Sequence, residues 1–126
     1  MEDERVEFDR SEFDRVLEHA DFARLIVMNR GEVKIIPVCF EFEPCKCGIH
    51  LKITGEGLRR LKLHKGEHIT LEFEAAFAGK VIIVIAEAEV CGFEEEHEKC
   101  SCHKDLSVIV RIKDVDIECF DIACGI

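Results

Sequence analysis

The chain has 126 residues, of which 48% are hydrophobic and 35% charged, and its formal net charge at pH 7 is -10. This length and balance suit a single domain over residues 1–126, and they exclude a wholly disordered chain. The negative charge repels nucleic acids and anionic membrane surfaces. Because the N-terminus is charged throughout and no apolar run approaches the roughly 20 residues that span a bilayer, we expect a cytoplasmic protein without nucleic-acid or membrane partners.

Residues 11–20 are predicted to form an amphipathic helix. Ser11 and Asp14 make an acidic variant of the capping-box pattern, and apolar side chains then recur at helical spacing. The apolar stripe consists of Phe13, Val16, Leu17 and Ala20. Since this stripe needs a surface to cover, we expect the helix to act as a lid on one end of the sheet that follows.

A β-hairpin is predicted from residues 23–29 and 32–42. Arg30 and Gly31 separate the two apolar runs, and glycine supplies the positive φ that a short hairpin turn needs. Pro37 cannot donate a ladder hydrogen bond, so the second strand is expected to lie at an edge or to carry a bulge there.

Residues 48–54 are predicted to form a third strand, and residues 56–66 a crossover with one short basic helix. Gly55, Glu56 and Gly57 break the strand, and the leucines that follow can pack inward while the basic side chains face outward. Gly66 is expected to cap the C-terminus of the helix.

The remaining strands are expected at residues 67–75, 80–90 and 106–112. Residues 81–85 are apolar on both faces, which indicates a second layer or a second subunit. The polar residues 91–105 are expected to form a solvated loop or helix face, and residues 117–126 a short tail. Closely spaced antiparallel strands favour a mainly β fold, namely a six-stranded antiparallel split β-barrel with an N-terminal helix and one short crossover helix.

The order and wording of these segments resemble the FMN-binding split-barrel family, to which pyridoxamine 5'-phosphate oxidase belongs. The matching segments are RSEFDRVLEHA, then FARLIVMNRGEVKIIPVCFEFE with its Gly-bearing turn and its Pro-Val before an aromatic, then GIHLKIT leading to GLRRL, KGEHITLEFE, GKVIIVIAEAEV and LSVIVRIKDVDI. The resemblance implies a homodimer of split barrels with FMN in clefts along the subunit interface. It also implies a flavin-dependent oxidoreductase that acts on a small-molecule substrate, for which no catalytic residue is assigned.

In this family the end of the third strand and the following helix supply the phosphate ligands, which correspond here to Lys52, Thr54, Arg59 and Arg60. The chemistry fits, because an arginine fork, a hydroxyl and amides near a helix N-terminus are charge-assisted or polar donors to phosphate. The alternative is that Arg59, Arg60 and Lys62 form the ordinary solvated face of an amphipathic helix. The segment is shorter than the family pattern, and without Tyr or Trp an aromatic beside the flavin has to be one of the nine Phe.

Two pairs of closely spaced cysteines are a second signal. They are Cys45 and Cys47, in the turn between the second and third strands, and Cys100 and Cys102 with the adjacent His103, in the polar segment before the last strand. Zinc prefers four soft ligands in a tetrahedron, so these turns are candidates for a zinc site, with His103 or His50 as a substitute ligand. The C-x-C spacing has a tighter bite than the usual zinc knuckle, and disulfides, inert buried thiols and redox-active thiols remain alternatives.

The bias towards Glu and Lys, with Asn29 as the single asparagine and no glutamine, is typical of proteins from thermophiles. Intracellular disulfides are common in hyperthermophiles, so the compartment leaves the state of the eight cysteines open. The competing functional class is therefore a non-catalytic β-barrel binding or structural module, stabilised by a cysteine-rich zinc site or by disulfides.

Overall fold

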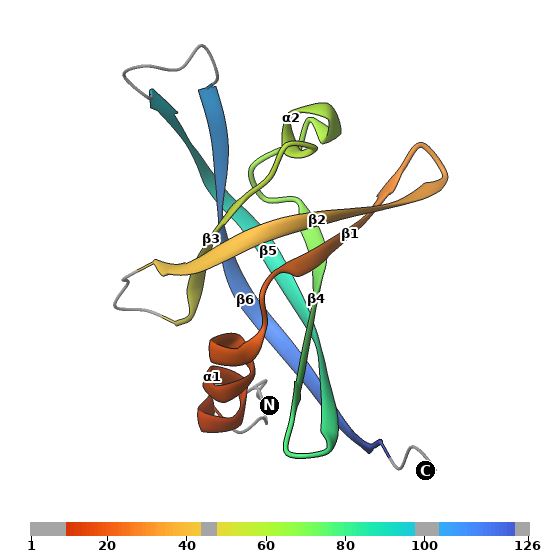
Figure 1. Ribbon diagram of the computed structural model, residues 1–126. Helices are drawn as coiled ribbons and strands as arrows, with labels where there is room; N and C mark the ends of the chain where they lie inside the picture. The colour runs from red at the N-terminus through yellow and green to blue at the C-terminus, as the bar shows by residue number, and fades with distance from the viewer. Residues whose placement is uncertain (1–9, 44–47, 98–103, 123–126) are drawn as a thin grey trace, which may run out of the picture.

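The computed structural model describes residues 10–43, 48–97 and 104–122. Within these ranges the elements are α1 (Arg10–His19), β1 (Ala23–Asn29), β2 (Glu32–Glu43), β3 (His50–Thr54), α2 (Leu58–Leu61), β4 (His68–Phe77), β5 (Lys80–His97) and β6 (Lys104–Asp121). The strands are antiparallel to their neighbours and close into a barrel in the order β1-β2-β3-β6-β5-β4 (Figure 1). The predicted mainly β fold, an antiparallel barrel with an N-terminal helix and one short crossover helix, is confirmed.

Alternating side chains of the strands build the core of the barrel. Leu25 of β1 lies opposite Leu71 of β4, and Phe73 of β4 lies opposite Val84 of β5. All four side chains are fully buried. The ring of Phe73 also meets the ring of Phe40 edge to face, with 5.0 Å between centroids, and this contact ties β4 to β2. Burying each large apolar side chain contributes about 1.5–3 kcal/mol, so these contacts fix the closure of the sheet.

The helix α1 covers part of this core. Its apolar stripe is buried at Phe13, Val16 and Leu17. The Phe13 ring meets Phe73 of β4 edge to face at a centroid distance of 5.9 Å. The amphipathic helix predicted for residues 11–20 is thus confirmed, and it packs against the barrel through β4. None of the helices in the described ranges has the length and apolar character that crossing a bilayer requires.

The β1–β2 hairpin turns at Arg30 and Gly31, whose φ angles are 56° and 81°. Two consecutive left-handed residues are typical of the type I′ turn, which suits the twist of a two-stranded ribbon. β2 pairs with β3 from Cys39 onward, and the preceding part of β2 has β1 on one side with no strand of the described chain on the other. Pro37 lies in this part, opposite Arg24. The edge position proposed for this proline is therefore confirmed, and it leaves β2 with a free edge.

The crossover helix α2 is a single turn. Both of its leucines and the following Leu63 are buried, as predicted. The helix ends at Lys62, whose left-handed backbone has a φ of 53°. The prediction that Gly66 caps the helix is wrong: Gly66 belongs to a later turn, and its N–H donates to the carbonyl oxygen of Val90 at 2.8 Å. The helix stops earlier because the chain must bend at Lys62 to bring Leu63 into the core.

The strands β5 and β6 form a long ribbon that extends beyond the barrel at both ends (Figure 1). They pair from Lys80 with Asp121 to His97 with Lys104. The prediction of a loop or helix face at residues 91–105 is therefore wrong for residues 91–97 and 104–105, which are strand. The prediction of a tail from residue 117 is wrong for residues 117–121, which belong to β6. Each strand satisfies the backbone hydrogen bonds of the other, and a two-stranded ribbon outside the barrel exposes its side chains to water, so a polar sequence is compatible with strand there.

Candidate functional site

Two of the predicted phosphate ligands, Lys52 and Thr54, lie on the outer face of β3. Their neighbours Leu51 and Ile53 are buried inside the barrel. The Thr54 hydroxyl is 3.2 Å from the hydroxyl of Ser107, a buried residue of β6 on the adjoining strand. The outer face of β3 is therefore polar at the level where the strand ends.

Lys52 is held between a carboxylate of the neighbouring strand β2 and one of β5, the strand beyond β6. Its Nζ lies 3.5 Å from Glu41 Oε2 on β2 and 3.5 Å from Glu94 Oε1 on β5. Its side chain is 16% exposed, so the ammonium is better shielded from water than a typical surface lysine. An anion that approaches this position would have to compete with Glu41 and Glu94, and we conclude that Lys52 is partly neutralised within the chain.

A close backbone approach holds α2 against β2. A Cβ atom at Gly55 would lie 3.0 Å from the carbonyl oxygen of Pro37 and 3.1 Å from a side-chain carbon of Val38. A Cβ atom at Gly57 would lie 2.9 Å from a methyl carbon of Ile36. Glycine at these positions lets the end of β3 and the start of α2 lie directly on the Pro-Val segment of β2. Gly55 and Gly57, which end the third strand, thus also position the arginines of α2.

The two predicted arginines, Arg59 and Arg60, are exposed on α2. Arg60 lines a cavity of about 350 Å³ between α2 and the free edge of β2, and Ile35, Ile36 and Pro37 form its apolar wall. Neither Lys52 nor Thr54 lines this cavity. The structure therefore brings Arg60 beside β2, while Lys52 and Thr54 lie apart from it on the outer face of β3. A helix of four residues has little macrodipole, so the arginines and not the helix end would supply the positive charge.

The phenylalanines of the barrel core are not available to contact a flavin. Phe13, Phe40 and Phe73 occupy the core in edge-to-face pairs. Phe22 lies against Arg24, whose guanidinium carbon is 5.6 Å from the ring centroid. Among the described residues, no phenylalanine lines the cavity beside Arg60. Apolar contacts there would come from Ile35, Ile36 and Pro37 instead of an aromatic ring.

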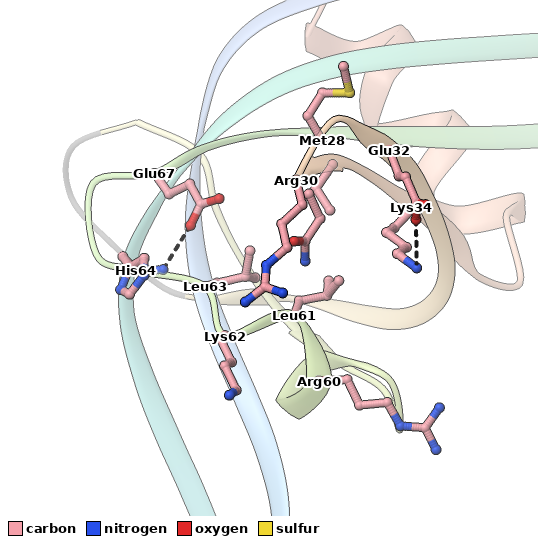
Figure 2. Close-up of a pocket in the computed structure, with 12 residues that line it drawn as sticks. Met28, Arg30, Glu32, Lys34, Arg60, Leu61, Lys62, Leu63, His64 and Glu67 are labelled. Atoms are coloured by element: carbon pink, nitrogen blue, oxygen red, sulfur yellow. Dashed lines mark hydrogen bonds and ion pairs between the residues drawn. The ribbon is translucent and has the colours of Figure 1, made fainter.

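A larger pocket, of about 680 Å³, opens between the tip of the β1–β2 hairpin and the chain from α2 to the start of β4 (Figure 2). We call it the mouth pocket. It is lined by Val27, Met28, Asn29, Arg30, Glu32, Lys34, Arg60, Leu61, Lys62, Leu63, His64 and Glu67. Sequence reasoning missed this pocket. The available signal was the appearance of polar residues, such as Asn29 and Lys34, at positions where the strand alternation would place core side chains.

The proposed zinc ligands Cys45, Cys47, Cys100, Cys102 and His103 lie outside the described residues. The strand ends that lead into the two segments lie at opposite ends of the β3–β6 ladder, because His50 pairs with Arg111 whereas β6 begins at Lys104. At about 3.3 Å per residue these ends are roughly 20 Å apart. Among the described residues, no group of His, Cys, Asp and Glu side chains is arranged to hold a metal ion.

No protein-family model matches the sequence, and no curated protein sequence matches it either. Several solved structures share its fold. The FAD binding protein from Mycobacterium smegmatis has a TM-score of 0.66 and 12% identity, over 90% of this chain and 97% of that protein. A candidate pyridoxamine 5'-phosphate oxidase from Corynebacterium glutamicum has a TM-score of 0.62 and 15% identity, over 93% of this chain and 98% of that protein.

The chain has the fold of a pyridoxamine 5'-phosphate oxidase-like split barrel. At these identities the likeness concerns the path of the backbone and not individual side chains. Nearly the whole length of each matched structure is covered, so the likeness is not confined to one part of the barrel. At the free edge of β2, beside α2, this split barrel combines basic side chains with a cavity.

Proposed function

We propose that this split barrel binds FMN as a homodimer and uses it to oxidise or reduce a small molecule. The proposal is supported by the fold, which is shared with one protein named for FAD binding and with another named as a pyridoxamine 5'-phosphate oxidase. The observation that carries it is the close approach at Gly55 and Gly57, which holds the exposed arginines of α2 beside the free edge of β2.

The residues present fit a flavin phosphate better than they fit a flavin ring. Arg59 and Arg60 would donate charge-assisted hydrogen bonds to the phosphate. Lys52 and Thr54 lie apart from the cavity beside Arg60, so the phosphate contacts proposed here are those of the two arginines. FMN, when bound, supplies the redox-active ring, whereas the protein supplies position, electrostatics and exclusion of water.

The proposed homodimer is supported by apolar side chains on the outside of the barrel. On the β1–β2 hairpin, Met28 is 69% exposed, Val33 is 59% exposed and Ile35 is 58% exposed. Met28 lies opposite Val33, and Ile26 lies opposite Ile35, so the four side chains form one patch, which we call the hairpin patch. Exposed apolar side chains that adjoin each other in this way are typical of interaction surfaces.

The phosphate assignment is tested by changing Arg59→Ala together with Arg60→Ala. Each charge-assisted hydrogen bond contributes about 1.5–3 kcal/mol, so losing two of them should weaken FMN binding about a hundredfold or more. FMN affinity is measured by quenching of flavin fluorescence, and circular dichroism checks that the fold is retained. Arg15→Ala with Lys65→Ala removes the same charge from exposed positions on α1 and on the loop after α2, and it should leave FMN affinity unchanged. Equal affinity in both double variants would refute the assignment.

The alternative function, a non-catalytic module held together by zinc or disulfides, makes a different prediction. Replacing Cys45→Ser together with Cys100→Ser should lower the melting temperature if the cysteine segments are cross-linked or bind metal, because both kinds of link stabilise the folded state. Metal analysis of the purified protein and melting curves with and without reductant distinguish zinc from disulfides. A melting temperature that is unchanged under both conditions would reject a structural role for these cysteines. Colourless protein with stoichiometric zinc would favour the module over the flavoprotein.

A further inference from the structure

The mouth pocket lies at an open end of the barrel. Val27 and Asn29 of β1 lie opposite Lys34 and Glu32 of β2, and these pairs continue the row in which Leu25 lies inside the core. The inward row therefore changes from leucine to asparagine and charged side chains as it leaves the core. Mouths of β-barrels are common places for small-molecule sites, and a volume of about 680 Å³ is within the usual range for them.

The floor and the far wall of the pocket are firmly held. Val27, Leu61 and Leu63 are buried residues that line its base. The turn after α2 is tied to β5, because Gly66 N–H donates to the Val90 carbonyl at 2.8 Å and Val90 N–H donates to the Glu67 carbonyl at 2.9 Å. The pocket therefore combines an apolar floor with a wall fixed by backbone hydrogen bonds, and it does not depend on the rearrangement of a loop.

Positive charge converges on this pocket in a chain whose net charge is -10. Arg30, Arg60 and Lys62 line it, and within the described ranges none of the three has a carboxylate partner. Lys34 Nζ lies 3.5 Å from Glu32 Oε1, an exposed contact of little energetic weight. Two carboxylates, Glu32 and Glu67, also line the pocket, and Glu67 accepts a hydrogen bond from the His64 N–H. The four cations still exceed the carboxylates, so this concave surface is suited to an external anion.

The geometry distinguishes inner from outer cations. Figure 2 shows Arg30 reaching from the hairpin turn toward Leu61 and Leu63, whereas Arg60 and Lys62 point away from the centre of the pocket. Arg30 adopts a left-handed backbone conformation with a φ of 56°. This is the conformation that the type I′ turn requires, so the turn fixes the direction in which the Arg30 side chain leaves the backbone. Lys34 lies opposite Val27 in the inward row, so Arg30 and Lys34 are the inner cations, and Arg60 and Lys62 form the rim.

We propose that the mouth pocket binds an organic phosphate of about nucleotide size. The phosphate group meets Arg30 and Lys34, because an arginine fork matches phosphate oxygens and two cations match a group carrying about two negative charges at neutral pH. The organic part lies on the apolar floor of Val27, Leu61 and Leu63. This inference stands without the flavin proposal, because its phosphate contacts are Arg30 and Lys34, whereas Lys52, Thr54 and Arg59 do not line the pocket. Arg60 and Lys34 line both the mouth pocket and the smaller cavity, so the two sites adjoin each other.

The experiment measures the binding of AMP to the full chain by isothermal titration calorimetry, with adenosine and inorganic phosphate as separate probes. AMP is expected to bind at least tenfold more tightly than either of its parts. In the variant Arg30→Asn with Lys34→Gln, AMP affinity should fall about tenfold for each cation removed. Asparagine tolerates the left-handed conformation at position 30, so the turn is retained. Lys65→Ala, which removes a nearby exposed cation that does not line the pocket, should leave AMP affinity unchanged.

Three results would overturn the proposal: adenosine that binds as tightly as AMP, phosphate that binds as tightly as AMP, or a double variant that retains full AMP affinity.

Two sources of the organic phosphate are separated by first loading the protein with FMN or with FAD. Arg60 lines both the mouth pocket and the smaller cavity, so one dinucleotide can occupy the two together. If AMP binds the FMN-loaded protein but not the FAD-loaded protein, the mouth pocket is the site for the adenylate half of a dinucleotide. AMP that binds both forms identifies a free phosphate ester. If the protein holds no flavin, the flavin proposal fails. The AMP titration of the flavin-free protein then decides the proposal for the mouth pocket.

Discussion

At the scale of single residues, the close approach of backbone to backbone at Gly55 sets the position of α2. A Cβ atom there would meet a carbonyl oxygen of β2 that cannot move aside without disturbing the pairing of β1 with β2. We expect Gly55→Ala to lower the free energy of unfolding by about 1–3 kcal/mol, the usual cost of inserting a methyl group into a packed region. Chemical denaturation measures this loss. FMN affinity should fall with it, since Arg59 and Arg60 follow directly in the chain.

The matched control is Gly92→Ala on β5, where a Cβ atom would have no heavy atom within 4 Å. Glycine in a strand costs about 0.5–1 kcal/mol relative to alanine. This change should therefore leave stability equal or slightly higher. If Gly92→Ala lowered the free energy of unfolding as much as Gly55→Ala, any added methyl group would destabilise the barrel. The close backbone approach at Gly55 would then not explain the loss of stability.

The ion pair between Lys80 and Asp121 fastens one end of the β5–β6 ribbon. Lys80 Nζ donates to Asp121 Oδ1 at 2.7 Å. This hydrogen bond and the accompanying charge attraction lower the pKa of Asp121 and raise the pKa of Lys80. The stabilisation is thus present from the ordinary Asp pKa of 3.8 up to the ordinary Lys pKa of 10.5. It is lost as the pH falls through the lowered value or rises through the raised one.

We expect Lys80→Met to return the pKa of Asp121 upward to its ordinary value, as measured by NMR titration of its carboxyl carbon. Both groups are exposed, so the effect on unfolding at neutral pH should be small. An Asp121 pKa that stays low in the variant would mean that another group holds the carboxylate, contrary to the geometry. Lys113→Met, which leaves this pair intact, is the control and should not move the pKa of Asp121.

At the scale of elements, the two hairpin turns share one conformation but differ in sequence. Ala78 and Gly79, between β4 and β5, have φ angles of 55° and 75°, close to those of Arg30 and Gly31. Alanine is strained in the left-handed region, where asparagine is tolerated. We expect Ala78→Asn to raise the free energy of unfolding by about 1 kcal/mol, because Asn-Gly is the preferred type I′ sequence. The measurement is the midpoint of urea unfolding.

Ala76→Asn provides the comparison for that turn. Ala76 is exposed and lies within β4, opposite Val81. Ala76→Asn therefore makes the same side-chain change as Ala78→Asn, but at a residue with extended backbone. Asparagine is disfavoured in strands, and this variant should be no more stable than the native chain. Equal gains at positions 76 and 78 would show that the turn conformation is not the source of the stabilisation.

The elements inside the barrel could be predicted because each of them carries its own local signal. The strand that contains Leu71 and Phe73 alternates cleanly, and the turns at Gly31 and Gly79 separate apolar runs. The ribbon beyond the barrel carries no such signal. Residues 91–97 are rich in glutamate, which favours a loop or a helix, yet they form a strand of the ribbon. Pairing between distant segments decides the structure there, and a local reading of the sequence does not contain it.

At the scale of the whole molecule, the functional surfaces arise from closure of the sheet. The arginines of α2 could be read from GLRRL, but their place beside β2 depends on the contacts of Gly55 and Gly57 across the barrel. The mouth pocket depends on closure even more, because residues 27–34 and 60–67 meet there from different parts of the chain. Lys34 had no identifiable role in the sequence, since nothing local distinguishes a pocket lysine from a surface lysine.

The hairpin patch gives the last prediction. We propose that a second copy of the chain covers Ile26, Met28, Val33 and Ile35, and that Val33→Lys with Ile35→Lys prevents this association. Burying a Val or Ile side chain contributes about 1.5–3 kcal/mol, so losing two from each protomer should weaken the dimer by a hundredfold or more. Sedimentation equilibrium over a range of protein concentrations measures the change in dimer affinity.

Phe120→Lys with Ile122→Lys is the control for that variant, because both residues are exposed apolar side chains far along the ribbon from the hairpin. It should leave the dimer intact. FMN affinity is a second readout in the single variant Val33→Lys, because Ile35 lines the cavity beside Arg60 and replacing it would disturb FMN directly. FMN in clefts between subunits should be lost together with the dimer. A native chain that sediments as a monomer at every concentration would refute the dimer. A monomeric hairpin variant that keeps its full FMN affinity would place the flavin within a single protomer, where Arg60 and the free edge of β2 would have to hold it alone.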